Sequence, residues 1–158
     1  MLVSRDSKLW GYIEEHIKDL IADGEALLKD AEIHEKSISD YSYLVFPFSK
    51  AYEGFLKKLF LDLHLIDKAQ FFGDEIRIGK ILNPSFKHHE HSVYGRVGSI
   101  KDKEVSEHLW TVWRNARNLV FHYYPHNFRK LSFRESENLI NDIVEAMTEA
   151  VELLDTND

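Results

Sequence analysis

Hydrophobic residues recur at helical spacing over most of this chain. The first stripe covers about residues 7–31, with charged residues on the opposite side of the predicted helix. The second stripe covers residues 44–63. Pro47 lies near its start, so we expect this helix to begin there or to kink there.

Two further stripes follow in the second half. One begins near Lys101 and stops near Pro125, because proline disfavours helix in the residue before it. The other opens with the sequence Ser132-Phe-Arg-Glu135, which has the spacing of a capping box, and continues to about Leu154. We find no internal repeat and no alternation typical of strands.

The middle of the chain lacks a regular period. Residues 71–99 contain four of the seven glycines and one of the three prolines, so we predict loops with one or two short helices there. The fold class is therefore all-α. We expect an up-and-down four-helix bundle with a loop-rich insertion between helices 2 and 3, forming one domain over residues 1–158.

Composition excludes several kinds of site. The chain has no cysteine, which removes disulfides, cysteine-based metal sites and thiol nucleophiles. The first ten residues lack the apolar core of a signal peptide, and no stretch reaches the ~18 uncharged apolar residues of a membrane span. We therefore expect a cytoplasmic protein with no membrane association.

The net charge of −7 argues against indiscriminate binding to nucleic acid, but it conceals an asymmetry. Residues 108–134 contain no Asp or Glu and five cationic side chains, so the remainder of the chain must carry −12. The five cations are Arg114, Arg117, Arg129, Lys130 and Arg134. A basic face on an acidic body suits brief contact with a polyanion, and we take Arg114, Arg129 and Lys130 as candidate RNA-binding residues.

The third predicted helix carries polar residues among its aromatic ones, in the string R-N-L-V-F-H-Y-Y from Arg117 to Tyr124. Asn118 and His122 are four residues apart and share a helix face. Arg117 and His122 diverge by ~140° in a straight helix. A long guanidinium can still reach the same place, particularly if the last turn before Pro125 is distorted.

Together these groups are suited to phosphodiester chemistry. Arginine offers a planar fork of donors that matches phosphate, and histidine is the side chain whose proton moves near neutral pH. Because no acidic cluster lies nearby to hold Mg²⁺, the sequence favours metal-independent attack by the 2′-OH of RNA. His122 would take the proton and Arg117 would stabilise the phosphorane. From spacing alone, however, a structural pair is the commoner explanation for one arginine and one histidine, and the helix dipole accounts for a C-terminal histidine without any function.

The string Arg117-Asn-Leu-Val-Phe-His122-Tyr-Tyr124 resembles the R-x4-H motif of the HEPN superfamily, including the asparagine after the arginine and the H-x-Y extension. It lies late in the third long helix, where HEPN domains carry it. The segment YLVFPFSKAYEGFLKKLF resembles the second HEPN helix with its acidic residue, here Glu53. The chain is most similar to HEPN domains of the RNase LS type in toxin–antitoxin systems.

The resemblance implies a ribonuclease in which Arg117 and His122 are the catalytic pair, and Asn118 and Glu53 support them. It implies a homodimer with a composite active site, no cofactor or metal, and products with 2′,3′-cyclic phosphate ends. It also implies an antitoxin, such as a small nucleotidyltransferase, for which Tyr124 would accept AMP. Two alternatives remain: a non-catalytic HEPN module that binds RNA, nucleotide or a protein partner, and a helical interaction subunit in which Arg117 and His122 are structural.

Other candidates are weaker. His88, His89 and His91 form the densest histidine cluster, but neighbouring loop residues rarely point at one ion, so we interpret the cluster as a solvated loop. The tryptophans Trp10, Trp110 and Trp113 are more typical of a core or an interface than of a base-stacking platform.

Overall fold

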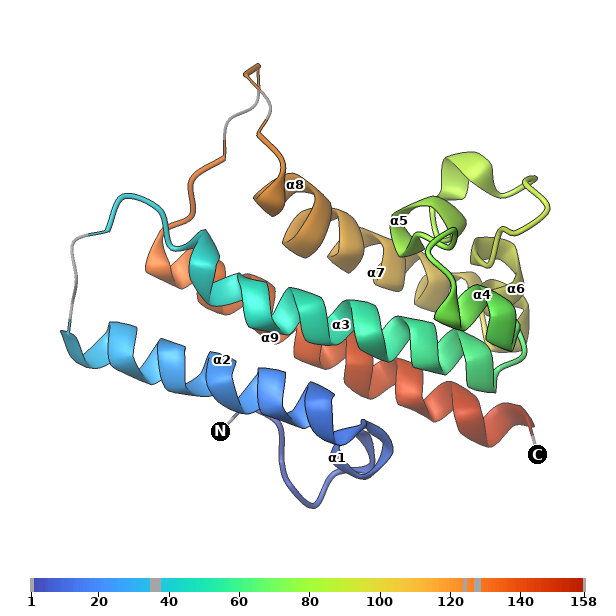
Figure 1. Cartoon of the computed structure of the whole chain (residues 1–158), viewed down its shortest axis with the longest axis horizontal. Coiled ribbons are helices and arrows are strands. Elements are labelled where there is room, and N and C mark those ends of the chain that lie inside the picture. The colour runs from blue at the N-terminus through green and yellow to red at the C-terminus, as the bar shows by residue number, and fades with distance from the viewer. Residues whose placement is uncertain (1, 35–37, 124, 127–128, 158) are drawn as a thin grey trace.

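All elements of the computed structural model, which describes residues 2–34, 38–123, 125–126 and 129–157, are helical. The all-α class predicted from the sequence is confirmed over these residues. The long helices are α2 (Glu15–His34), α3 (Ser42–Asp62), α7 (Lys103–Trp113) and α9 (Phe133–Val151). Figure 1 shows successive long helices running in alternating directions, the up-and-down arrangement of a helix bundle.

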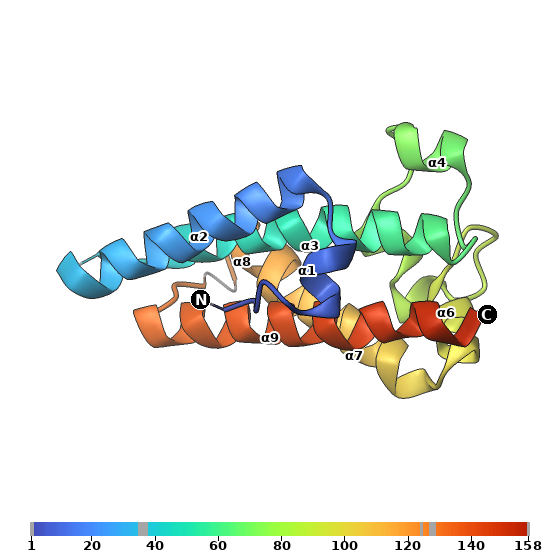
Figure 2. The same cartoon turned by 90° about the horizontal axis from the view of Figure 1, so that it is seen from below.

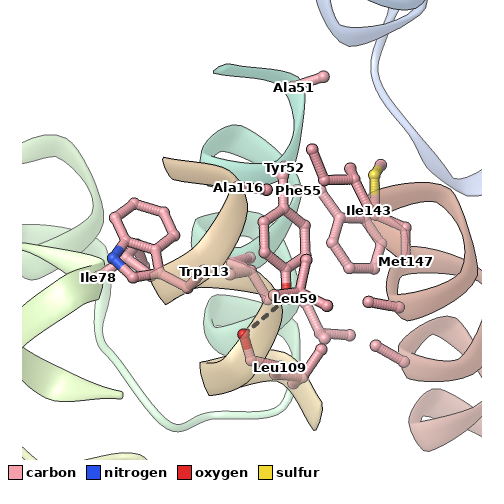
Figure 3. Close-up of a cluster of buried hydrophobic side chains, with 14 of the residues drawn as sticks. Ala51, Tyr52, Phe55, Leu59, Ile78, Leu109, Trp113, Ala116, Ile143 and Met147 are labelled. Carbon is pink, nitrogen blue, oxygen red and sulfur yellow. Dashed lines mark hydrogen bonds between the residues drawn. The ribbon is translucent and has the colours of Figure 1, made fainter. Parts of the chain in front are cut away.

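Helix α3 lies at the centre of the bundle. It packs against α2 on one side and α9 on the other, and α7 closes the bundle against α9 (Figures 1 and 2). Its aromatic residues Phe48, Tyr52 and Phe55 are fully buried, and Figure 3 shows part of this core. The Tyr52 hydroxyl donates a 3.0 Å hydrogen bond to the carbonyl oxygen of Leu109, which joins α3 to α7. Burial raises the pKa of Tyr52 well above its ordinary value, so this phenol remains a neutral donor.

A glycine sets how closely α2 approaches α3. A Cβ atom at Gly24 would lie 2.4 Å from the ring of Phe48, a separation that no pair of carbon atoms tolerates. Glycine therefore allows the large ring of Phe48 to pack directly against the backbone of α2.

The prediction of one helix over residues 7–31 is wrong, because this region contains two helices. Helix α1 covers Lys8–Tyr12 and starts on the side chain of Ser7, and α2 begins after a break. Ile13 adopts extended backbone angles at this break while its side chain stays buried. Since the apolar stripe continues through Ile13, periodicity does not reveal the interruption.

Proline does not start the second predicted helix. Helix α3 begins at Ser42, and Pro47 lies inside it as a buried residue. The capping box of the fourth helix is confirmed: Ser132 accepts from the backbone N–H of Glu135, whose carboxylate accepts from that of Ser132. A 3₁₀ helix, Glu152–Asn157, follows α9.

The insertion between the second and third long helices is more helical than predicted. It contains α4 (Lys68–Phe72), α5 (Ile78–Ile81), a 3₁₀ turn (Pro84–Phe86) and α6 (Tyr94–Ile100). Two α-helices, α5 and α6, begin within residues 71–99, which agrees with our expectation of one or two short helices; α4 and the 3₁₀ turn are additional. Helices of four to seven residues are too short to show a period, and their buried residues, such as Ile78 and Val97, appear isolated in the sequence.

Among the described residues, no helix combines the length and the apolar character that crossing a membrane requires.

Candidate functional site

The third long helix changes its geometry where the motif begins. After α7, residues Arg114–Asn118 form a π-helical turn, which we call the π turn, and α8 (Leu119–Phe121) follows. The backbone N–H of Leu119 donates to the carbonyl of Arg114, five residues back. A π turn holds one residue more than an α turn, so residues five apart come to the same side. The helix is therefore distorted at the start of the motif, although the π hydrogen bond joins Leu119 to Arg114 and His122 lies beyond α8 in an extended conformation.

Two side chains from outside the helix hold the π turn. The hydroxyl of Ser49, on α3, donates a 2.6 Å hydrogen bond to the carbonyl oxygen of Ala116. The guanidinium of Arg129 donates a 3.3 Å hydrogen bond to the carbonyl oxygen of Asn115. The carbonyl oxygens of Asn115 and Ala116 therefore both accept hydrogen bonds from side chains, as polar backbone groups inside a protein require.

Four of the predicted site residues line one solvent-open cavity of about 530 Å³: Glu53, Arg117, Asn118 and His122. Glu53 comes from α3, Arg117 and Asn118 from the π turn, and His122 from the residue that ends α8 in an extended conformation. His122 is exposed, and the other three are partly buried. The motif residues therefore share one environment.

The guanidinium of Arg117 lies between an acid and two aromatic rings. Its Nε is 3.7 Å from Oε2 of Glu53, an ion-pair distance longer than a hydrogen bond. Its Cζ lies 5.9 Å from the ring centroid of Trp113 and 5.7 Å from that of Phe121. Because both charged side chains are 34% exposed, the ion pair contributes at most about 1 kcal/mol, and the guanidinium keeps access to the cavity.

Trp113 forms the floor beneath Arg117. It is buried, and its indole is tilted against Tyr52 with 6.4 Å between ring centroids. Figure 3 shows the indole projecting toward Ile78 of α5. A Cβ at Gly79 would lie 2.7 Å from Nε1 of Trp113, so only glycine lets α5 approach this closely. The core interpretation of Trp113 fits this burial.

The cavity also has lining residues that the sequence analysis did not connect with the motif. Arg77 and Lys80 of the α5 segment line the cavity and are exposed, and the aromatic residues Phe86 and Trp110 line it as well. They come from the irregular middle region and from α7, and no motif connects them with Arg117. Arg77 and Lys80 are separated only by Ile78 and Gly79, and two cations three residues apart are too common to indicate a site.

The remaining candidates lie elsewhere. Arg114 and Lys130 are exposed and outside the set of residues that line the cavity, whereas Arg129 contacts the π turn. Tyr124, the candidate AMP acceptor, lies outside the described residues.

The histidine cluster has its own internal contacts. The N–H of His91 donates to Nδ1 of His89 over 3.3 Å, and Nδ1 of His91 lies 3.3 Å from the side-chain nitrogen of Gln70. His88 is exposed beside them. In the part of the chain that the structure describes, no three side chains of metal-ligating type are grouped to hold an ion.

Comparisons with protein-family models, with curated proteins and with solved structures find no match to this chain.

Proposed function

We propose that this chain is a HEPN-type endoribonuclease that cleaves RNA without a metal ion and acts as a toxin or defence component. The observation that carries the proposal is the cavity shared by Arg117, Asn118, His122 and Glu53. An arginine fork and an exposed imidazole at one open cavity are the two groups that cleavage of a ribose-phosphate linkage requires.

The chemistry uses the nucleophile of the substrate. The imidazole of His122 takes the proton of the 2′-OH, and the 2′ oxygen attacks the adjacent phosphorus. The guanidinium of Arg117 stabilises the charge on the phosphorane oxygens. The bond between phosphorus and the 5′ oxygen then breaks, the 5′ oxygen takes up a proton from water, His122 releases its proton to water, and a 2′,3′-cyclic phosphate remains. Asn118 orients the pair, and the pairing with Glu53 positions Arg117.

The proposal includes a homodimer with a composite site. Exposed aromatic side chains lie beside the motif: Phe46 is 54% and Tyr123 is 73% exposed. Phe46 packs edge-on against Phe121, which in turn contacts Arg117. Exposed aromatic residues next to a site are typical of an interface. An antitoxin, such as a small nucleotidyltransferase that modifies Tyr124, belongs to the same proposal.

The deciding experiment incubates single-stranded RNA with the purified protein in EDTA. We expect cleavage by the natural sequence and losses of about 10²-fold or more for both Arg117→Ala and His122→Ala. Arg117→Lys retains the charge but not the fork, so it should also be impaired. The control His16→Ala removes an exposed histidine of α2 and should cleave normally. Cleavage that never occurs, or that survives both alanine variants, excludes the nuclease.

One observation favours the alternative, a non-catalytic module that binds RNA or nucleotide. Arg117 is already ion-paired with Glu53, and Arg77 and Lys80 add charge to the same cavity. RNA binding that disappears in Arg117→Ala, without cleavage by any variant, identifies this module. Changes in thermal stability alone identify a helical interaction subunit.

A further inference from the structure

The cavity at the motif extends well beyond Arg117 and His122. Two aromatic side chains, Phe86 from the 3₁₀ turn and Trp110 from α7, form part of its lining, which we call the aromatic wall. Phe86 is 45% exposed, so part of its ring is accessible to a ligand. Trp110 is half-buried and presents part of its indole to the same space.

This wall is held in place by the chain around it. The side chain of Asn83 accepts from the backbone N–H of Ser85 over 2.9 Å, and the N–H of Phe86 donates to the carbonyl of Asn83 over 3.0 Å. These bonds fix the turn that carries Phe86. The close approach of Gly79 to the buried indole of Trp113 fixes α5 against the end of α7, directly before the π turn. The aromatic wall is thereby preorganised relative to the motif.

Two cations belong to the lining of the same cavity. Arg77 and Lys80 both line the cavity and are exposed, so they can contact phosphates on either side of a bound nucleotide. An aromatic wall combined with cations is the arrangement with which proteins hold single-stranded nucleic acid, since every base has a face that stacks on an aromatic ring.

We infer that this wall is a base-binding subsite, in which one nucleobase of single-stranded RNA stacks on Phe86 beside Trp110 while Arg77 and Lys80 contact its flanking phosphates. The inference rests on the proposed function, because the motif defines which linkage lies next to this base. The volume of about 530 Å³ is within the range of small-molecule sites, so the cavity admits a base together with its sugar. A base paired within a duplex is not free to enter, which restricts the substrate to single strands, loops or ends.

The test measures binding without cleavage. The probe is a fluorescent single-stranded RNA of about eight nucleotides, 2′-O-methylated throughout so that no 2′-OH nucleophile is present. Binding is followed by fluorescence anisotropy. We expect Phe86→Ala to raise Kd by about tenfold, which corresponds to the loss of one base–aromatic stack. Phe72→Ala is the matched control, because Phe72 is 79% exposed on α4 and does not line the cavity.

A second series locates the base. In probes with one abasic nucleotide, one position should weaken binding to the natural protein and have no further effect on Phe86→Ala. Lys80→Ala should weaken binding and reduce its salt dependence, whereas Lys101→Ala, an exposed lysine outside the cavity, should not. Equal Kd values for the natural protein and Phe86→Ala, or equal losses in Phe86→Ala and Phe72→Ala, overturn the subsite.

Failure of the subsite and failure of the nuclease give different results. Cleavage of unmodified RNA with unchanged binding in Phe86→Ala overturns the subsite and leaves the nuclease intact. Probe binding that depends on Phe86, without cleavage of unmodified RNA, overturns the nuclease and retains the subsite. A natural protein that neither binds the probe nor cleaves RNA overturns both.

Discussion

The Ser49 hydroxyl and the Ala116 carbonyl, 67 residues apart in the chain, are joined by a buried hydrogen bond of 2.6 Å. The bond connects the central helix α3 to the π turn that carries Arg117. It ends on the residue directly before Arg117, so the position of that arginine depends on a serine in another helix.

Replacing Ser49 tests this dependence. Ser49→Ala removes the donor and leaves a buried carbonyl with a poorer set of partners, so we expect a loss of about 1–3 kcal/mol of unfolding free energy in urea titrations. The π turn can then relax and displace Arg117. The RNA cleavage rate should therefore fall even under conditions in which the variant remains fully folded. The control is Ser136→Ala: Ser136 is also fully buried and donates to the carbonyl of Tyr41 over 3.0 Å, and neither residue lines the motif cavity. Equal activity in the two variants would show that Ser49 is only a core residue.

Gly79 supplies a second test of the site's framework. In Gly79→Ala the new Cβ would lie 2.7 Å from the rigid, buried indole of Trp113, so α5 must move away. We expect a loss of about 1–3 kcal/mol, as for other overpacked cores, together with weaker RNA binding. Gly95→Ala in α6 meets no atom within 4 Å and should be neutral or slightly stabilising. Thermal melts of the two variants compare them directly.

Asp40, in the connection before α3, should make the free energy of unfolding depend on pH. Burial alone would raise the pKa of Asp40, but hydrogen bonds from Ser42 and from the backbone N–H of Leu131 outweigh it and hold that pKa below its ordinary value. A lowered pKa in the folded state means that the stabilisation is complete above the unfolded value of about 4 and disappears as pH falls through the folded value.

Asp40→Asn keeps the acceptor oxygen and removes its charge. We expect the variant to be less stable than the natural sequence by about 1 kcal/mol at pH 7, because charged acceptors form the stronger hydrogen bonds. The difference should shrink as the pH falls below about 4, where the carboxyl of the unfolded chain becomes protonated, and should disappear below the lowered pKa of folded Asp40. A constant difference between pH 7 and pH 3 in denaturant titrations would contradict this assignment.

The exposed Phe46 tests the proposed dimer. Phe46→Ala should raise the dimer dissociation constant by about tenfold or more in sedimentation experiments, because truncating a buried interface aromatic typically costs over 1 kcal/mol. Cleavage should fall at low protein concentration and recover at high concentration, as a composite site requires. Phe72→Ala removes an even more exposed phenylalanine, in α4, and should leave the association unchanged. A natural protein that is monomeric at all concentrations excludes the composite site.

The sequence predicts the long helices well because a period repeated over fifteen or more residues is hard to mistake. The break at Ile13 is invisible to the same method, since its side chain stays on the apolar stripe while its backbone leaves the helix. The π turn is also hidden. Its sequence, Arg-Asn-Ala-Arg-Asn, has neither glycine nor proline, and the donors that hold it come from Ser49 and Arg129.

Some residues of the candidate site could likewise be predicted from the sequence, and others could not. Arg117, Asn118, His122 and Glu53 could be singled out because a local motif and its resemblance connect them. Arg77, Lys80 and Phe86 could not, because they approach the motif only through the packing of short helices that have no period of their own. Arg129 was selected by its charge, yet its guanidinium contacts a backbone carbonyl, and charge alone does not distinguish these roles.

A substitution at Glu53 should affect RNA binding and RNA cleavage in opposite directions, so it distinguishes the two. The carboxylate of Glu53 lies 3.7 Å from Nε of Arg117 and faces the cavity that the proposal assigns to phosphate, so it attracts the guanidinium and repels the substrate. Glu53→Gln removes the repulsion, and we expect the Kd of the non-cleavable RNA to fall about two- to fivefold, consistent with a partly exposed charge. The maximal cleavage rate should fall at the same time, because Arg117 loses the partner that positions it.

Glu145→Gln is the control. Glu145 lies on the exposed side of α9, and its replacement changes the net charge equally, so neither the Kd nor the cleavage rate should change. Weaker RNA binding by Glu53→Gln would mean that Glu53 contacts the substrate directly, and an unchanged cleavage rate would mean that Arg117 needs no partner.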